Sequence, residues 1–111
     1  MVDTVGNRKR RRTSPVRIVW THAAIRDLMQ IRRYIERDNS PAASSVAAQI
    51  LKSVNRLVNH PKMGRVGRLS GTRELVISKT PYVVPYRAQG ETIELLRVLH
   101  SRQQWPTKRR R

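Results

Sequence analysis

Residues 71–100, GTRELVISKTPYVVPYRAQGETIELLRVLH, decide the fold of this chain. They contain three runs rich in Val, Ile, Leu and Tyr, at 71–77, 81–87 and 93–100, with turn residues between them. Short runs of this composition are typical of strands, so we predict a three-stranded antiparallel meander. Because proline cannot donate to a ladder, we expect a bulge at Pro85, or a Pro85 nitrogen that faces away from any partner strand.

A short strand and two helices are predicted upstream of this meander. The strand covers residues 16–20, and Thr21 stands where the N-cap of the first helix belongs. Ser40 can cap the second helix, and Pro41 suits its first position. Both helices have apolar residues at helical spacing, namely Ala24, Leu28, Ile31 and Ile35 in the first and Ala43, Ala47, Ile50, Val54 and Leu57 in the second.

This order of elements predicts an α+β fold. An N-terminal strand and an antiparallel helical hairpin would pack with an antiparallel sheet that the C-terminal three-stranded meander completes. A chain of 111 residues suits one domain. We expect a flexible basic arm at 1–15, the domain at 16–106 and a basic tail at 107–111, with a glycine-bearing basic loop at 62–72 leading into the sheet.

Composition excludes several classes of protein. The chain has no cysteine, so it has neither disulfides nor a cysteine-based metal site. His22, His60 and His100 have no metal-ligand spacing, and we expect no metal and no cofactor. No apolar run approaches the roughly 20 residues of a membrane span, and the N-terminus does not resemble a secretory signal. The sequence therefore predicts a cytoplasmic protein without a membrane partner.

The charge is strongly positive. Lys and Arg number 24 against 7 Asp and Glu, a formal net charge of +17. Residues 8–12 and 108–111 hold nine of the cations and Asp3 is the acid beside them, so removing these ten charges leaves +9 on residues 16–106. A basic body indicates an acidic partner, either nucleic acid or an acidic protein segment.

A series of short motifs runs in order through residues 16–106. They are Trp20-Thr21-x-x-Ala24, Asp27-Leu28-x-x-Ile31-x-x-Tyr34-Ile35, Asn39-x-Pro41-x-Ala43, Leu57-x-x-x-Pro61-x-x-Gly64-Arg65, Gly71-Thr72-Arg73-Glu74-Leu75, Pro81-Tyr82 and Arg97-Val98-Leu99-His100. In this order they resemble the RelE/ParE superfamily of toxins from bacterial type II toxin–antitoxin systems. The resemblance implies a growth-arresting protein that an acidic antitoxin neutralises by wrapping a helix and an extended segment around it.

The superfamily has two branches, and the resemblance implies one of two targets. ParE-like toxins poison DNA gyrase, whereas RelE-like toxins are ribosome-dependent mRNA endonucleases. A typical nuclease strand reads Tyr-Arg-Leu-Val-Tyr, but here Val83 stands in place of that arginine. Glu74 and Val76 likewise stand where the nuclease branch often has lysines. These departures favour the gyrase-directed branch, which is not known to cut nucleic acid.

For a gyrase-directed toxin, the predicted target-binding residues are the basic positions Arg65, Arg68, Arg73, Arg97 and Arg102, together with His100. The alternative is a metal-independent endoribonuclease that uses His100, Arg97 and Tyr86, with His100 as general acid or base because histidine titrates near neutral pH. A third possibility is an inactive toxin-fold protein that binds nucleic acid or antitoxin. Trp105 would cap the edge of the core or pack against an antitoxin side chain.

Overall fold

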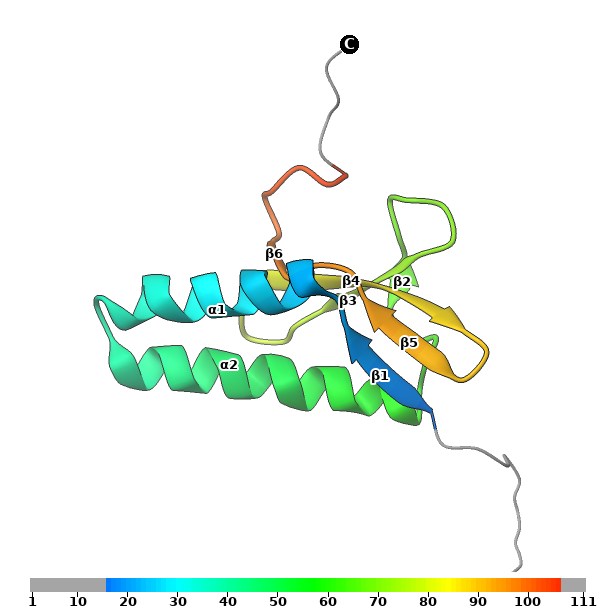
Figure 1. Cartoon of the computed structure of the whole chain (residues 1–111). Helices are drawn as coiled ribbons and strands as arrows, with labels where there is room; N and C mark the ends of the chain where they lie inside the picture. Colours follow the sequence, from blue (N-terminus) through cyan, green and yellow to red (C-terminus); the bar gives the residue numbers. More distant parts are fainter. Residues whose placement is uncertain (1–15, 107–111) are drawn as a thin grey trace, which may run out of the picture.

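The computed structural model describes residues 16–106, so the expected arm and tail lie outside the described residues. Two helices pack on a mixed sheet, which confirms the α+β class (Figure 1). In chain order the elements are β1 (Arg17–Trp20), α1 (His22–Glu36), α2 (Ser40–Asn55), the 3₁₀ turn η1 (Arg56–Val58), β2 (Arg65–Val66), β3 (Arg73–Val76), β4 (Tyr82–Gln89), β5 (Thr92–Leu95) and β6 (Leu99–His100).

The two helices form the expected hairpin. The N-cap of α1 was predicted correctly and that of α2 was not. Thr21 caps α1 as expected, since its Oγ1 accepts from the Ala24 N–H at 3.1 Å, and the same hydroxyl donates to the Leu95 carbonyl at 2.9 Å. The cap of α2 is Asn39, whose Oδ1 accepts from the Ala42 N–H at 3.0 Å, and not Ser40. Asn caps as well as Ser, so the helix starts one residue earlier than predicted.

The sheet differs from the predicted one in two respects. Its order is β1-β5-β4-β3-β2, with β6 also paired to β4, and β1 runs parallel to β5, so the sheet is mixed and not wholly antiparallel. The third predicted strand is also two strands, since β5 pairs with one end of β4 and β6 with the other. Residues 96–98 leave the sheet between them because Arg97 binds α1 and Val98 enters the core.

Pro85 lies within β4 without loss of a ladder bond. Its carbonyl accepts from the Leu96 N–H at 2.9 Å, on the side away from β3. The nitrogen and carbonyl of a strand residue point to the same side, so the Pro85 nitrogen faces the place where the chain leaves the sheet. The nitrogen therefore faces away from β3, as one of the two expected arrangements requires, and lies just beyond the end of β5.

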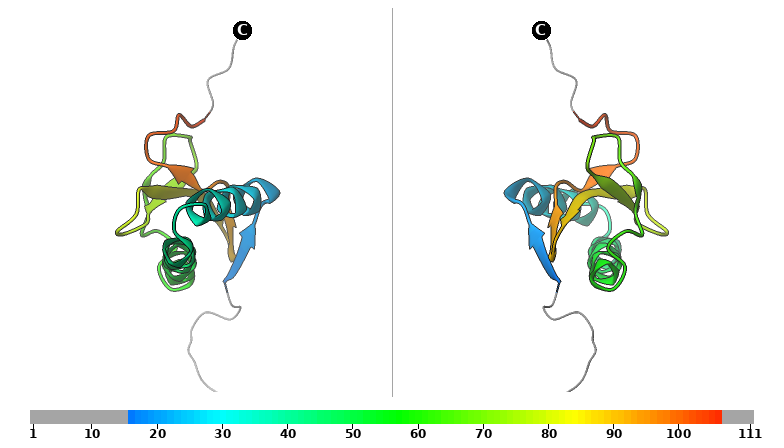
Figure 2. Two further views of the ribbon diagram at one scale, coloured as in Figure 1. Left: turned by 90° about the vertical axis from the view of Figure 1, so that its left-hand side faces the viewer. Right: turned by 90° about the vertical axis from the view of Figure 1, so that its right-hand side faces the viewer.

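The helix-facing side of the sheet is buried, and the opposite face is buried in part. Leu75, Val84, Tyr86 and Leu95 pack with the helices in the main core. Alternate residues such as Val83, with 1 % of its surface exposed, point to the second face. Two segments, 62–72 and 101–106, lie on that side of the sheet, away from α2 (Figures 1 and 2). This arrangement brings the basic loop and the C-terminal segment to the same face.

Candidate functional site

Glu74 on β3 organises the basic loop on the second face. Its carboxylate is 2 % exposed and accepts from Arg68 Nε at 2.9 Å, from the Arg68 backbone N–H at 3.0 Å and from Arg65 Nη2 at 3.2 Å. Burial alone would raise the pKa of this carboxyl, but the hydrogen bonds from Arg68 and Arg65 outweigh it and lower the pKa below its ordinary value. Two of the predicted target-binding arginines are thus held by one carboxylate.

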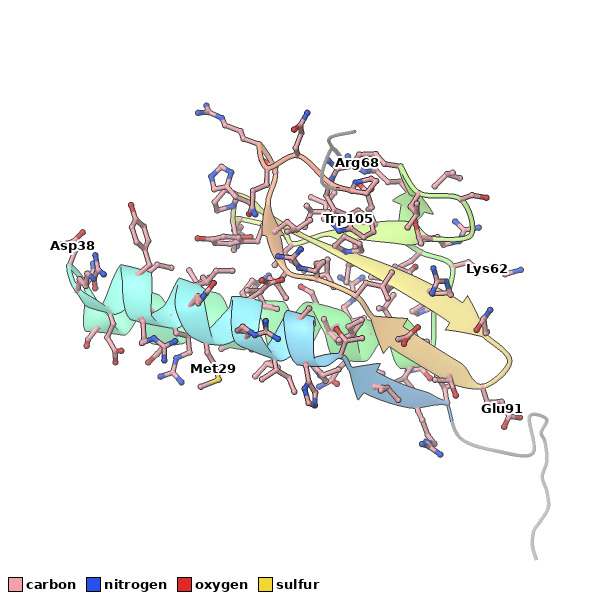
Figure 3. The ribbon with its side chains drawn as sticks, turned by 45° about the horizontal axis from the view of Figure 1, so that its top comes forward. Met29, Asp38, Lys62, Arg68, Glu91 and Trp105 are labelled. Carbon is pink, nitrogen blue, oxygen red and sulfur yellow. The ribbon has the colours of Figure 1, made fainter. Side chains whose placement is uncertain are left out.

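Further hydrogen bonds fasten the loop to its surroundings. Arg68 Nη1 also donates to the Gln103 carbonyl at 3.4 Å, which joins the loop to the C-terminal segment. Arg73 Nη1 donates to the Gly64 carbonyl at 2.9 Å. In Figure 3 Arg68 and Trp105 both lie above the strands, on the side away from the helices. Loop, sheet and C-terminal segment therefore form one connected surface.

Tyr86 cannot take the role that the nuclease hypothesis gives it. Its side chain is fully buried in the main core, where the hydroxyl donates to the Pro61 carbonyl at 2.8 Å and accepts from the Gly64 N–H at 2.9 Å. Burial raises the pKa of Tyr86. A Cβ on Gly64 would lie 2.6 Å from the ring, so glycine is what allows this close contact. Tyr86 secures the start of the loop, and a phosphate has no access to it.

Arg97 and His100 line a groove between α1 and the C-terminal segment. The groove encloses about 370 Å³, and Gln30, Tyr34 and Tyr82 contribute to its walls. Tyr82 and His100 meet edge to face, with ring centroids 5.9 Å apart and planes at 81°. Burial, together with the nearby Tyr34 hydroxyl, raises the pKa of Tyr82. The structure therefore gathers three aromatic rings at this place.

Arg97 is held in a fixed orientation at the groove. Its Nε and Nη2 donate to the two carboxylate oxygens of Asp27 at 2.7 and 3.0 Å, and the Val98 N–H donates to the same carboxylate at 2.9 Å. The hydrogen bond to Asp27 raises the pKa of Arg97. Because Asp27 neutralises this guanidinium, Arg97 offers a phosphate less attraction than an unpaired arginine would.

His100 and Arg102 belong to a tight turn at the end of β6. The Arg102 N–H donates to His100 Nδ1 at 3.1 Å, and the His100 N–H donates to Gln103 Oε1 at 3.0 Å. Nδ1 is an acceptor in this arrangement, so Nε2 is the ring nitrogen left for another partner. The Arg102 side chain is exposed, and within residues 16–106 it makes no salt bridge.

The predicted site residues thus fall into two neighbouring groups. Arg65 and Arg68 belong to the loop and Arg73 to the start of β3 beside it, whereas Arg97, His100 and Arg102 belong to the groove and the turn next to it. Prediction from sequence missed the roles of the two acidic partners. Glu74 binds Arg65 and Arg68, and Asp27 binds Arg97. For Asp27 the pattern held no local sign, because Arg97 is 70 residues away.

Within the described residues no group of His, Asp and Glu is arranged to hold a metal ion. Neither described helix is long and apolar enough to cross a membrane.

Comparison with known proteins places this arrangement in context. Residues 18–105 match the family model described as ParE toxin of type II toxin–antitoxin system, parDE. The protein "Putative toxin Y4kP" of Sinorhizobium fredii is 47 % identical over 90 residues, which cover 81 % of this chain and 93 % of that protein. Toxin RelE2 of Caulobacter vibrioides is 32 % identical over 84 residues, covering 76 % of this chain and 93 % of RelE2.

A solved structure shows the same fold. The chromosomal ParDE toxin–antitoxin system from P. aeruginosa contains a chain that superposes with a TM-score of 0.68 at 28 % identity, covering 75 % of this chain and 92 % of that one. The relatives carry both ParE and RelE names, so their names alone do not decide between the two targets.

Proposed function

The chain belongs to the ParE toxin family of type II toxin–antitoxin systems, and on this premise we propose that it arrests growth by binding and poisoning DNA gyrase. The family implies an antitoxin partner. We further propose that this antitoxin is acidic and neutralises the toxin, because the described body of the toxin carries a net charge of +9.

The observation that supports gyrase over RNA cleavage is the chemistry of the second sheet face. Metal-free RNA cleavage needs groups that activate the 2′-hydroxyl and stabilise the phosphorane. Here Val83 is buried, and Arg65 and Arg68 are occupied by Glu74. Tyr86 is in the core. A face built in this way supports recognition of a protein surface better than phosphate chemistry.

Pulse labelling of DNA and protein synthesis in the first minutes after induction tests this proposal. We expect DNA synthesis to fail first while translation continues. Purified gyrase should then lose supercoiling activity, or accumulate cleaved DNA, when the purified chain is added. Translation that fails first would contradict the proposal and favour the RelE-type mechanism.

The site assignment is tested best at residues whose substitution does not leave a buried charge without its partner. Alanine at Arg65 or Arg68 would leave Glu74 partly unpaired, so loss of toxicity could reflect unfolding. His100→Ala combined with Arg102→Ala removes a histidine and an exposed arginine without that effect. The matched control is His22→Ala with Arg26→Ala, on exposed positions of α1. We expect the first pair to lose toxicity and the second to keep it.

A nuclease remains the second candidate because His100 and Arg97 line one groove. It predicts that His100→Gln ends mRNA cleavage in translating ribosomes, whereas undiminished cleavage would remove His100 from the mechanism. The third candidate, an inactive toxin-fold protein, predicts salt-sensitive binding to nucleic acid without growth arrest.

A further inference from the structure

The groove between α1 and the C-terminal segment also carries Gln30, Tyr34 and Gln103, to which the proposed gyrase contact gives no role. Tyr34 projects from α1 with 68 % of its surface exposed. Across from it lie Tyr82 and His100, already in edge-to-face contact. Exposed aromatic rings on a basic protein are the usual platform on which unpaired bases stack.

The polar groups of the groove suit a flat heterocycle. Gln30 and Gln103 bring carboxamides, which can both donate to and accept from the edge of a base. Arg97 is fixed by Asp27, so its planar guanidinium is presented in one orientation and its net charge is balanced. A neutral, planar, hydrogen-bonding ligand of about nucleoside size fits this lining and the 370 Å³ of the groove.

Arginines lie close in sequence to several groove-lining residues. Positions three and four residues apart lie on one face of a helix, so Arg33 and Arg37 neighbour Gln30 and Tyr34 along α1. Both arginines are exposed, as is Arg102, two residues after the groove-lining His100, and within residues 16–106 none of the three forms a salt bridge. Exposed cations near an aromatic groove can contact the phosphates that flank an inserted base.

We propose that this groove binds an unstacked base of single-stranded nucleic acid, with Tyr34 as the stacking platform and Arg33, Arg37 and Arg102 as phosphate contacts. This activity goes beyond gyrase binding and does not depend on it. An acidic peptide would be attracted by the same arginines, but it would leave the two tyrosines and two carboxamides without a planar partner.

Fluorescence anisotropy with the full chain tests the proposal without gyrase. The probes are labelled DNA and RNA single strands of about 12 nucleotides, within the usual site size for such proteins. Tyr34→Ala should weaken binding by about 5- to 100-fold, the range for one lost base–aromatic stack, with little change in salt dependence. Tyr34→Phe should restore binding. Arg102→Ala should reduce the slope of log K against log salt by about 0.7.

The matched control is Met29→Ala, which truncates a half-exposed side chain on another face of the same helix. It should bind like the parent chain. The DNA and RNA arms show which sugar is preferred, and either preference supports the groove. Binding that is unchanged in Tyr34→Ala would overturn the proposal, because charge alone would then explain it.

Two further measurements test the proposal independently of the folding of the variants and against an acidic peptide ligand. A 5-bromouracil strand irradiated with the unmodified chain should crosslink to Tyr34 or Tyr82, which needs no variant to fold; crosslinks confined to other residues would overturn the proposal. A labelled acidic peptide of similar charge is titrated in parallel. If Tyr34→Ala weakens binding of the peptide by the same factor as binding of the nucleic-acid strand, the groove recognises acidic peptide and the base-binding proposal is wrong.

Discussion

The two faces of the sheet differ in their chemistry and in how completely they are buried, since on the second face Val83 and Glu74 are buried but Val76 is 55 % exposed. Against the helices, Leu75, Val84 and Leu95 pack in an apolar core. On the opposite face, Val83 is just as well covered, but the neighbouring buried side chain is Glu74, held by two arginines that are 59 % and 38 % exposed. One face thus depends on apolar packing, and the other on hydrogen bonds between the buried Glu74 carboxylate and two partly exposed arginines.

This difference has a functional consequence. Apolar packing responds little to salt or pH, whereas an ion cluster responds to both. The second face also carries the loop and the C-terminal segment, which hold three of the six predicted target-binding residues, Arg65, Arg68 and Arg102. The surface proposed to meet the target is therefore the part of the fold most sensitive to its solution environment.

The largest expected effect is on the helix-facing side. Leu95→Ala removes a fully buried side chain from the core and should lower the free energy of unfolding by about 2–5 kcal/mol. Urea unfolding of the purified chain measures it. Leu51→Ala is the matched control, because Leu51 is 44 % exposed on α2 and should change stability far less. Equal losses would mean that Leu95 is not a core residue.

A smaller effect is expected on the second face. Glu74→Gln keeps the shape of the side chain but removes the charge, and it should lower stability by about 1–3 kcal/mol because the lost hydrogen bonds are charge-assisted. Hydrogen exchange should rise in residues 62–72 and not in the helices. Glu94→Gln, at an acid that is 41 % exposed, is the control and should have little effect. Faster exchange throughout the chain would contradict the separation of the two faces.

The same carboxylate predicts a response to acid. The pKa of Glu74 is lower in the folded chain than in the unfolded one, so its contribution is fully present above the ordinary carboxyl value. It declines as the pH falls below that value towards the lower folded pKa. The stability difference between the parent and Glu74→Gln should therefore be constant near neutral pH and shrink in acid. A difference that grows in acid would reverse the sign of the assigned shift.

The smallest expected effect is at an ion pair open to solvent. Arg87 and Glu94 approach to 3.5 Å with 32 % and 41 % of their side chains exposed. Arg87→Ala should change stability by less than about 1 kcal/mol, and salt should remove most of that. A loss as large as that of Glu74→Gln would show that exposure does not set the strength of these pairs.

Local patterns predicted the local features of the fold. Helical spacing located both helices, and Thr21 was correctly predicted as an N-cap because its role depends on residues within one turn. The choice of Asn39 over Ser40 was missed because adjacent residues with equal capping ability cannot be separated by propensity. The strands of the meander were found, but not the break after Leu95.

The missed features are those that depend on distant residues. Nothing near Arg97 in the sequence shows that it will pair with Asp27, and this pair is what draws residues 96–98 out of the sheet. The parallel course of β1 likewise follows from the path of the helical hairpin and not from residues 17–20 themselves. At the candidate site, Tyr86 fitted the family pattern, yet only the packing of Gly64 against its ring reveals it as a core residue.

The parallel pairing of β1 with β5 determines when the fold can first be completed during synthesis. Residues 17–20 have to wait for residues 92–95 before they gain their ladder, and the Thr21 hydroxyl waits for the Leu95 carbonyl. Contacts so far apart in sequence favour late, all-or-none folding. A nascent chain therefore cannot complete this edge of the sheet, or the Thr21 contact, until residues 92–95 have left the ribosome.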